Sequence, residues 1–472
     1  MIVTGGLAWV LGELAALAHI VIAASVTVHV LLYKRNVGTS ISWMGIAWLS
    51  PFVGGLLYYA FGVNRVKRRA LRLRRKRGHM FPVAQLAPDA PEAGPLTPLE
   101  HAIGRLTGLS AEPGNNVELM RNGDGTYPAM LAAIDEAVHS VGLCSYIFRD
   151  DKAGMPFIEA LIRAHRRGVQ VRVLIDGIGA GYFRSGTYSR LHEAGVPVDR
   201  FLHSYVPWKT PFLNLRNHRK LMVVDGRIAF TGGINIGHEN LLATNPPHPV
   251  RDTHFRLEGP VVEQLTEAFA DDWLYETGER LQDDAWFPSL HPAGEAIARV
   301  ITSGPAEDLE QIEFAMLHAI SCARRSIRVV TPYFLPPDLL TTALGLAAMR
   351  GVAVDIVVPE HSNHMVLDWA RRASLRTVLE AGCRVWLLPA PFDHSKLMMI
   401  DEAWSLIGSA NWDTRSLRLN FELNVEIQDE AFARRLAAVA ASGRPLTLAE
   451  INGASLARRL RDNAARLMQP YL

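Results

Sequence analysis

The sequence contains the same series of segments twice after about residue 115. In each copy a GlyVal pair opens a run of alternating apolar residues, a segment rich in Leu, Ala and Gly follows, and a His-x-Lys motif comes last. The matching segments are 168–176 and 351–358, 191–202 and 379–389, and 217–237 and 393–413. Two copies of one unit in a chain tend to pack about a pseudo-twofold axis. We therefore expect the matching motifs to face each other across one cleft.

Each copy has the pattern of an α/β unit. The valine-rich runs VRVLI and VDIVV are typical of buried strands, and residues 154–167 and 312–325 are typical of helices. We place the first repeat at 116–290 and the second at 297–430. Residues 431–472 are expected to form an amphipathic helical tail with no part in catalysis. The predicted fold class is therefore α/β, with two repeats related by a pseudo-twofold axis.

Both copies contain the motif His-x-Lys-x-x-x-x-Asp. Its residues are His218, Lys220 and Asp225 in the first copy and His394, Lys396 and Asp401 in the second. One such match is weak, but two matches in register indicate chemistry. The alternating pattern predicts that the His and the Lys lie on one face of a strand and point into the same space. All six residues form the candidate catalytic set. The aspartates follow at a different spacing, so within this set we expect them to pair strand or loop groups more than to take part directly in the chemistry.

The residue types indicate a phosphate site. A lysine beside the histidine repels a divalent metal ion, and the three widely spaced cysteines offer no zinc cluster, so we predict no metal. Lysine supplies positive charge to phosphate oxygens, and histidine is a nucleophile or a proton donor near neutral pH. The chain has only seven lysines among its 49 basic residues, yet both motifs use one. Two such histidines allow a two-step displacement through a phosphohistidine, without a cofactor.

Polar residues downstream of each motif complete the candidate site. Asn235 and Asn411 lie 17 residues after the two histidines, in Gly-rich turns, and Ser409 lies in the second turn. We expect these three residues to contact phosphate, because Gly-rich backbone approaches anions closely and an amide donates hydrogen bonds. A nucleophilic histidine also needs an acidic partner to fix its tautomer, and Asp252 and Glu422 are the candidates.

The N-terminal residues 1–64 contain two apolar segments, at about 7–33 and 41–63. Each exceeds the roughly 20 residues that cross a bilayer as a helix, so we predict a transmembrane hairpin rather than a cleaved signal. Residues 65–115 follow as a basic stretch and a Pro-rich linker. The basic stretch at 65–77 holds nine Lys and Arg residues and no acid, which places the body on the cytoplasmic side. It could also bind anionic headgroups.

The two motifs, with GGINIG and GSANWDTRS, resemble the phospholipase D superfamily. The hairpin, RDTHFRLEGP, TPYFLP and LNFELN resemble bacterial cardiolipin synthases more closely, over nearly the whole chain. This resemblance implies transfer of a phosphatidyl group between two phosphatidylglycerol molecules in the bacterial inner membrane, giving cardiolipin and glycerol. It implies that His218 is the nucleophile and His394 the acid and base. Lys220, Lys396, Asn235 and Asn411 correspond to the phosphate-binding positions.

Other functions remain open at this point. A hydrolytic membrane phospholipase D would use the same residues, and another donor lipid or alcohol acceptor fits them too. A nuclease is disfavoured, because the chain outside 65–77 has 40 basic against 47 acidic residues and nucleic acid binding needs distributed positive charge. A lipid-binding scaffold is disfavoured by two intact motifs. The sequence leaves the oligomeric state open.

Overall fold

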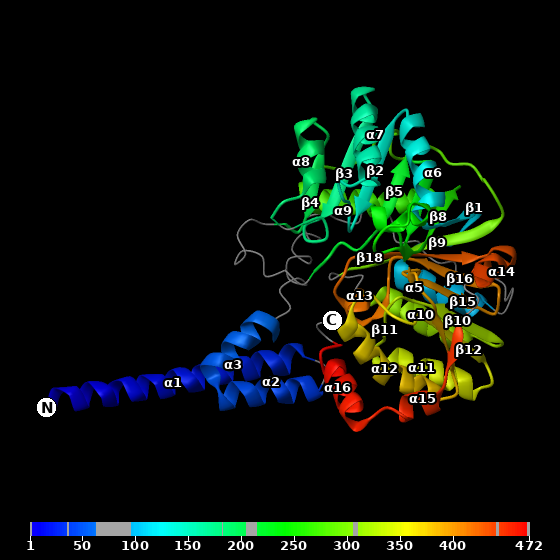
Figure 1. Cartoon of the computed structure of the whole chain (residues 1–472). Helices are drawn as coiled ribbons and strands as arrows, with labels where there is room; N and C mark the ends of the chain where they lie inside the picture. Colours follow the sequence, from blue (N-terminus) through cyan, green and yellow to red (C-terminus); the bar gives the residue numbers. More distant parts are fainter. Residues whose placement is uncertain are drawn as a thin grey trace. The chain divides into compact units, whose positions relative to one another are not determined.

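The computed structural model describes residues 2–34, 37–62, 96–181, 183–203, 215–304, 310–439 and 443–469. The chain divides into two compact units, an N-terminal group of helices and a body that holds both repeats (Figure 1). Each unit is described by itself. The basic stretch predicted at 65–77 lies outside the described residues.

The N-terminal unit consists of α1 (Ile2–Tyr33), α2 (Val37–Leu49), α3 (Pro51–Leu57) and the π-helical turn η1 (Tyr58–Gly62). Within α1, residues 12–33 are long and apolar enough to cross a membrane. The second predicted helix, at 41–63, is not continuous, because the helical structure is interrupted at Ser50, between α2 and α3. Ser50 leaves the helical region there, with φ −146° and ψ 75°, since the proline that follows it disfavours helical backbone.

The helices of this unit pack on one another through a small apolar core. Val26 and Val30 on α1 contact Ala47 on α2 and Tyr58 in η1. The Tyr58 hydroxyl lies 2.6 Å from His29 Nδ1, so this contact also satisfies a polar group inside an apolar segment. The two apolar stretches thus pack against each other as helices, and their crossing of a membrane as a hairpin stays a prediction.

One sheet of 15 strands runs through the body and joins the two repeats. From its middle outward, the first repeat contributes β1, β8, β6, β5, β2, β3 and β4, and the second contributes β9, β18, β16, β15, β10, β12, β13 and β19. The strands of the first repeat are β1 (Glu112–Arg121), β2 (Ser140–Ser145), β3 (Gln170–Asp176), β4 (Val198–Phe201), β5 (Leu221–Val224), β6 (Ile228–Gly232) and β8 (Thr253–Glu258). Those of the second are β9 (Ala296–Ser303), β10 (Ser326–Val330), β12 (Ala353–Pro359), β13 (Arg384–Leu388), β15 (Leu397–Ile400), β16 (Trp404–Gly408), β18 (Glu422–Gln428) and β19 (Arg444–Leu446).

The two strand orders match position by position, with β19 added at the far edge of the second repeat. β1 and β9 pair in antiparallel fashion at the junction, so the two repeats meet head to head. The sheet therefore has the pseudo-twofold arrangement that the sequence repeat predicts.

Helices cover both faces of this sheet (Figure 1). The first repeat contributes α6 (Asn122–Glu136), α7 (Gly154–Arg166), α8 (Gly186–Glu193) and α9 (Val261–Thr277). The second repeat and the tail contribute α10 (Gln311–Cys322), α11 (Asp338–Met349), α12 (Met365–Glu380), α13 (Thr414–Arg418), α14 (Glu430–Val439), α15 (Leu448–Asn452) and α16 (Leu456–Leu467).

Alternation along each strand divides the apolar residues among three cores. In β3, Val171, Val173 and Ile175 pack with α6, α7 and α8, whereas Leu174 points into a central core with α9. An equivalent outer core lies under α10, α11 and α12, and α14 joins α9 in the central one. Because the central core draws residues from both repeats, neither repeat is packed independently of the other.

Three local predictions were wrong. His218 and Lys220 lie just before β5 and not in a strand, and His394 and Lys396 likewise precede β15. The N–H group of each histidine bonds to the other repeat instead of to a neighbouring strand. The end of the predicted linker forms α5 (Thr97–Thr107), where Pro98 is tolerated in the first helical turn. The tail contributes the strand β19 as well as helices.

A buried ion pair ties α5 to the sheet. Arg299 on β9 donates to Glu426 on β18 at 2.5 Å, and it also donates to the carbonyls of Leu109 and Glu100 at 3.0 and 3.1 Å. Trp404 Nε1 donates to the second oxygen of Glu426 at 2.7 Å. Both charged side chains are fully buried, so each depends on the other for its solvation.

We expect Arg299→Met to lower the free energy of unfolding by about 3–5 kcal/mol, because it leaves the Glu426 carboxylate buried without a cation. The double variant Arg299→Met/Glu426→Leu should recover most of this loss, since it removes both charges. Denaturant titration of the full chain in detergent micelles measures both. A double variant no more stable than the single one would contradict this account.

Candidate active site

Backbone contacts between the repeats place the first histidine. Asn217 forms a bridge with Phe421 of the second repeat, and the His218 N–H donates to the Phe421 carbonyl at 2.9 Å. Glu422 follows Phe421 at once and opens β18. The first histidine is therefore fixed beside an acidic residue of the other half.

The second histidine is placed in the same way, with the repeats exchanged. The short strand β14 (Phe392–Asp393) pairs with β7 (Val250–Arg251) of the first repeat. The His394 N–H donates to the Arg251 carbonyl at 2.7 Å, and Asp252 follows Arg251. The two contacts are equivalent under the pseudo-twofold, and both cross from one repeat to the other.

Each imidazole is bound to the carboxylate of the opposite repeat. His218 Nδ1 lies 2.9 Å from Glu422 Oε1, and His394 Nδ1 lies 2.8 Å from Asp252 Oδ2. An ionised carboxylate only accepts hydrogen bonds, so each Nδ1 carries a proton and each Nε2 keeps its lone pair. The two predicted orienting residues thus hold the tautomer in which Nε2 is the reactive atom.

Burial dominates the titration of these pairs. It lowers the pKa of both His218 and His394 to about 4, against the opposing effect of the facing carboxylates. Burial acts to raise the pKa of Asp252 and Glu422, but the nearby lysines and histidines hold both below their ordinary values. At neutral pH the resting site therefore contains two neutral imidazoles and two carboxylates.

The two motif lysines supply the balancing positive charge. Lys220 Nζ donates to the His218 carbonyl at 2.7 Å, and Lys396 Nζ donates to the His394 carbonyl. Burial lowers the pKa of Lys220 to about 7 and that of Lys396 to about 8. Lys396 also lowers the pKa of Lys220, and both lysines lower the pKa of both histidines. Lys396 Nζ also lies 2.9 Å from His394 Nδ1, which is close enough to disfavour a charged imidazole.

The predicted phosphate-binding turn residues differ in their surroundings. Asn235 Oδ1 accepts a hydrogen bond from the Ile147 N–H at 3.2 Å. Asn411 Oδ1 is buried with no hydrogen-bond partner in the described part of the chain, whereas the same side chain is hydrogen-bonded to Asp413. Ser409 is committed, because its hydroxyl donates to Glu422 at 2.6 Å and accepts from the Leu423 N–H at 2.9 Å. Ser409 therefore positions the carboxylate that faces His218, and its contact with phosphate stays a prediction.

The motif aspartates lie away from the imidazoles. Asp225 accepts hydrogen bonds from the N–H groups of 138–140 at 2.7 to 3.0 Å, which fixes the turn before β2. Asp401 accepts from those of 324–326 at 2.7 to 2.9 Å, which fixes the equivalent turn before β10. The geometry is that of a structural role, as expected from their spacing, and gives them no place among the catalytic groups.

Two tyrosines at the site were not found from the sequence. The Tyr146 ring packs edge-on to His218 at 5.0 Å between centroids, and Lys220 Nζ lies 5.4 Å from the centre of the same ring. Tyr333 packs edge-on to His394 at 6.2 Å. Tyr146 follows β2 in the sequence SYIFRD, and Tyr333 follows β10 in the sequence TPYFLP. A tyrosine soon after the equivalent buried strand of each repeat is the sequence signal that could have identified them.

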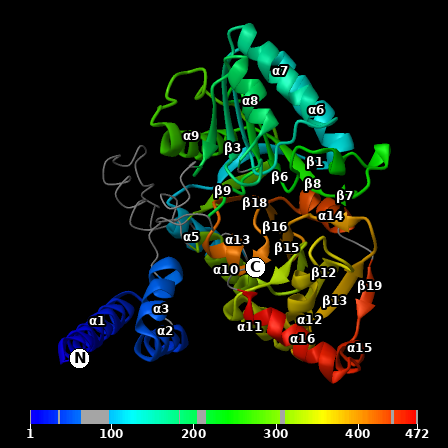
Figure 2. The same ribbon diagram turned by 60° about the vertical axis from the view of Figure 1, so that its left-hand side comes forward.

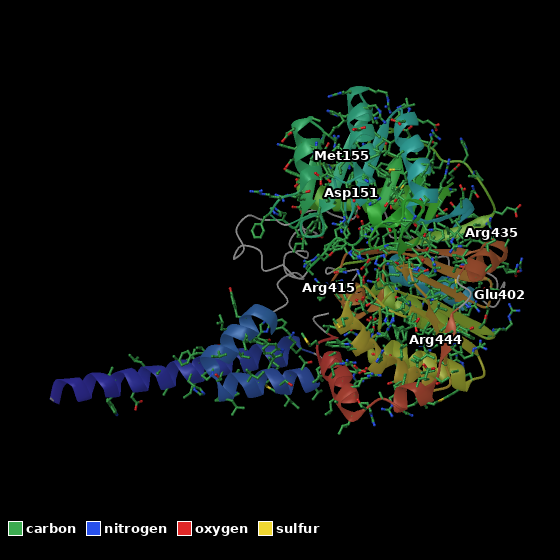
Figure 3. The ribbon with its side chains drawn as sticks, viewed as in Figure 1. Asp151, Met155, Glu402, Arg415, Arg435 and Arg444 are labelled. Carbon is green, nitrogen blue, oxygen red and sulfur yellow. The ribbon has the colours of Figure 1, made fainter. Side chains whose placement is uncertain are left out.

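Two arginines add positive charge near Tyr146. Arg216 and Arg415 both lower the pKa of Tyr146 against the stronger effect of burial, which raises it. Figure 3 shows Arg415 on α13, at the level where the two repeats meet. Among the described residues no three His, Cys, Asp or Glu side chains are grouped so as to hold a metal ion.

Comparison with known protein families agrees with the division of the body into two repeats. The family described as "Cardiolipin synthase, PLD-like domain" matches residues 130–273 and 316–442, one segment in each repeat. The chain belongs to the cardiolipin synthase family. The family described as phospholipase D-nuclease N-terminal matches residues 21–62, across the N-terminal helices.

Relatives in the cardiolipin synthase family match nearly end to end. The chain is 31% identical to the major cardiolipin synthase of Bacillus subtilis, with 93% of this chain and 95% of that protein covered. It is 32% identical to cardiolipin synthase A of Pseudomonas putida, with 98% of each covered. A phosphatidylserine synthase from Haemophilus influenzae, 15% identical, superimposes with a TM-score of 0.57 over 75% of this chain and 95% of that one, which shows a shared fold.

The lowered lysine pKa values predict the alkaline limb of activity. The positive charge of Lys220 and Lys396 is lost as the pH rises through about 7 to 8, instead of near 10.4 as for exposed lysines. We expect kcat/KM for a soluble phosphodiester substrate to fall over this range. In the double variant Lys220→Arg/Lys396→Arg the guanidinium groups stay charged. The fall in kcat/KM should therefore move to higher pH, even if the maximum value of kcat/KM is lower. An unchanged alkaline limb would refute the assignment.

The aspartate geometry predicts a loss of stability without a loss of chemistry. Asp225→Asn exchanges one acceptor oxygen for an amide donor facing backbone N–H groups, and should lower the free energy of unfolding by about 2 kcal/mol. Asparagine tolerates the positive φ of 50° at this position, so backbone strain is not added. Turnover per folded molecule, measured below the melting transition, should stay near wild type. Loss of turnover in fully folded protein would show that Asp225 acts in the reaction.

Proposed function

We propose that the protein transfers a phosphatidyl group from one phosphatidylglycerol to the hydroxyl of another, producing cardiolipin and glycerol. The observation that carries this proposal is the pair of imidazoles, each held by a carboxylate of the opposite repeat with Nε2 left reactive. Lys220 and Lys396 supply charge for phosphate oxygens beside them. Membership of the cardiolipin synthase family supports the lipid class.

In the first step, Nε2 of His218 attacks phosphorus and forms an N–P bond. The P–O bond to the glycerol headgroup breaks, and His394 gives a proton to the departing alkoxide. Glu422 accepts the hydrogen bond from His218 Nδ1 and so stabilises the positive charge that develops on the ring. The products of this step are free glycerol and a phosphatidyl-histidine.

In the second step, the primary hydroxyl of another phosphatidylglycerol attacks the phosphorus. His394, now neutral, takes the hydroxyl proton, the N–P bond breaks and His218 is released. The proton balance therefore closes over the cycle, and no oxidant, nucleotide or metal ion enters it. The assignment of His218 as nucleophile rests on the family resemblance, because the two pairs have equivalent geometry.

The resting pKa values fit a reaction with an anionic substrate. His394 must carry a proton to act as an acid, but burial and Lys396 keep its pKa near 4 in the empty site. A phosphodiester anion bound between the imidazoles raises that pKa by direct attraction. Binding of the substrate and protonation of the acid are thus coupled, and an empty site holds no charged imidazole.

We also propose that both N-terminal apolar segments cross the inner membrane and that the body lies on the cytoplasmic side. Phosphatidylglycerol substrates and membrane association agree with the family. The support for the orientation is the count of basic residues, nine at 65–77 against Lys34 and Arg35 in the link between the segments.

The experiment that tests the reaction uses the purified full chain with phosphatidylglycerol alone, in a metal-chelating buffer. We expect cardiolipin and glycerol from the wild type. His218→Ala and His394→Ala should each lower turnover by at least 10³-fold, because each removes a group that acts in both steps. His192→Ala, which changes an exposed histidine stacked on Tyr188, serves as the control and should be fully active.

Three outcomes would contradict the scheme. Wild-type turnover in either active-site variant would exclude the two-histidine mechanism. Phosphatidic acid as the main lipid product would show that water is the acceptor. A requirement for added metal would exclude direct attack by histidine on an unassisted phosphodiester.

A further inference from the structure

The last helix of the chain, α16, buries one face and leaves an apolar face uncovered. Asp462 and Ala465 are its buried residues, and Ala465 packs with Ala370 of α12. Leu456, Leu460 and Leu467 are 71%, 63% and 78% exposed. At 100° per residue these three leucines fall within about 40° of one another, so they form one ridge along the helix.

The uncovered face extends beyond α16. Met468 at its end is 52% exposed, and Met365 at the start of the neighbouring α12 is 67% exposed. Figure 2 shows α16 in red running along α12, and the buried contacts between the two helices agree. A soluble protein scatters exposed leucines singly, whereas a ridge of this kind marks a surface that something covers.

Arginines flank this ridge, and several have no partner. The α16 sequence LARRLRDNAARL holds four arginines and one acid. Arg461 is engaged with Trp369 and Asp462, but Arg458, Arg459 and Arg466 make no side-chain hydrogen bond or ion pair with any described residue. Arg372, on the adjacent α12, makes none either. An amphipathic helix with leucines on one face and free arginines beside them is typical of helices that lie in a membrane interface.

The free arginines line a groove between α12, β19, α15 and α16. Its volume is about 310 Å³, and Arg372, Arg458, Arg459 and Arg466 all line it. At its base lies Arg371, which is only 5% exposed and donates to the Pro359 carbonyl at 2.7 Å. The Arg371 Nε is buried with no hydrogen-bond partner in the described part of the chain. Arg371 is paired with Asp368 at 3.0 Å, and the acids that line the groove, Glu360, Glu450 and Asp462, are paired with Arg444 and Arg461. The four other arginines have no such partner among the described residues, and a concave site with this excess of guanidinium groups favours a phosphate.

The groove and the active site are joined through the end of α16. The Gln469 side chain donates to the carbonyls of Leu335 and Pro336 at 2.7 and 3.0 Å. β11 (Phe334–Leu335) begins directly after Tyr333, whose ring packs against His394. The end of the tail helix is therefore anchored to the strand that directly follows an active-site tyrosine.

We propose that α16 and its groove form a docking surface for an anionic bilayer, with the leucine ridge among the acyl chains and a lipid phosphate in the arginine-lined groove. At 100° per residue Arg459 and Arg466 lie about 80–100° from the centre of the leucine ridge, so the edge of the groove that they form can engage the same membrane surface as the ridge. Charge complementarity selects anionic over zwitterionic lipid. The inference rests on the proposed function for the identity of the lipid, and it gives the tail a role that the sequence pattern did not assign.

Depth-dependent quenching tests the ridge in the full chain. A fluorophore is placed at Leu460→Cys in a Cys322→Ser background, in which the remaining Cys144 and Cys383 are buried. The His218→Ala variant is used throughout, so that quenching is measured without turnover and is independent of the proposed chemistry. In proteoliposomes carrying acyl-chain nitroxide lipid, we expect at least twofold quenching when phosphatidylglycerol is present. A probe at Val138→Cys, an exposed apolar position in the first repeat, should be unquenched.

Charge-matched variants test the groove. Arg459→Gln/Arg466→Gln should lower the quenching of the Leu460 probe by more than half, because it removes two unpaired groove cations. Arg166→Gln/Arg184→Gln removes two exposed arginines of the first repeat and should leave quenching unchanged. Equal quenching in vesicles of phosphatidylcholine alone would overturn the role of charge. An unquenched Leu460 probe in all vesicles would overturn the docking surface and leave a protein partner as the occupant.

Discussion

The crossed bonds between imidazole and carboxylate are the interaction on which this structure depends. Each histidine belongs to one repeat and its acid to the other, so the reactive tautomer exists only when the repeats are assembled. The head-to-head sheet, the paired segments before each histidine and the shared central core all serve this assembly. A shift of one residue between the repeats would move both acids out of reach.

The site also shows how buried charge is tolerated. Two lysines and two carboxylates lie within one buried region, and each group lowers the cost of burying its opposite. The two carboxylates do not fully offset the cost of burying the lysines, since both lysine pKa values fall well below the ordinary value. An arriving phosphodiester adds negative charge to this site and stabilises the charged lysines. Electrostatic stabilisation of this kind is preorganised, because no large side-chain movement is needed to create it.

Much of the fold and the site could be predicted from the sequence, because the signals were local or duplicated. The alternation in β3 and β12 gave buried strands, and the doubled motif gave both histidines and lysines. The candidate acids Asp252 and Glu422 were found, but their crossed pairing depends on register between segments some 140 to 200 residues apart. No local pattern carries that information.

The surroundings of Ser409 also depend on distant segments. It lies in a Gly-rich turn, and the strand beside it places its hydroxyl on Glu422. In the first repeat the same position is Gly233, where an added Cβ would lie 2.1 Å from Asp252 Oδ1. The longer glutamate leaves space for a serine and the shorter aspartate does not. Such differences between the repeats are set by three-dimensional packing.

The crossing has a consequence for the ancestry of the chain. A symmetric dimer of single-repeat polypeptides would form both imidazole–carboxylate pairs between subunits, with no covalent link required. Fusion of two such genes would preserve the geometry while freeing each copy to diverge, as Gly233 and Ser409 have done. A single-repeat monomer would have been inactive, because the Nδ1–H of its histidine would have lacked the carboxylate that accepts its hydrogen bond.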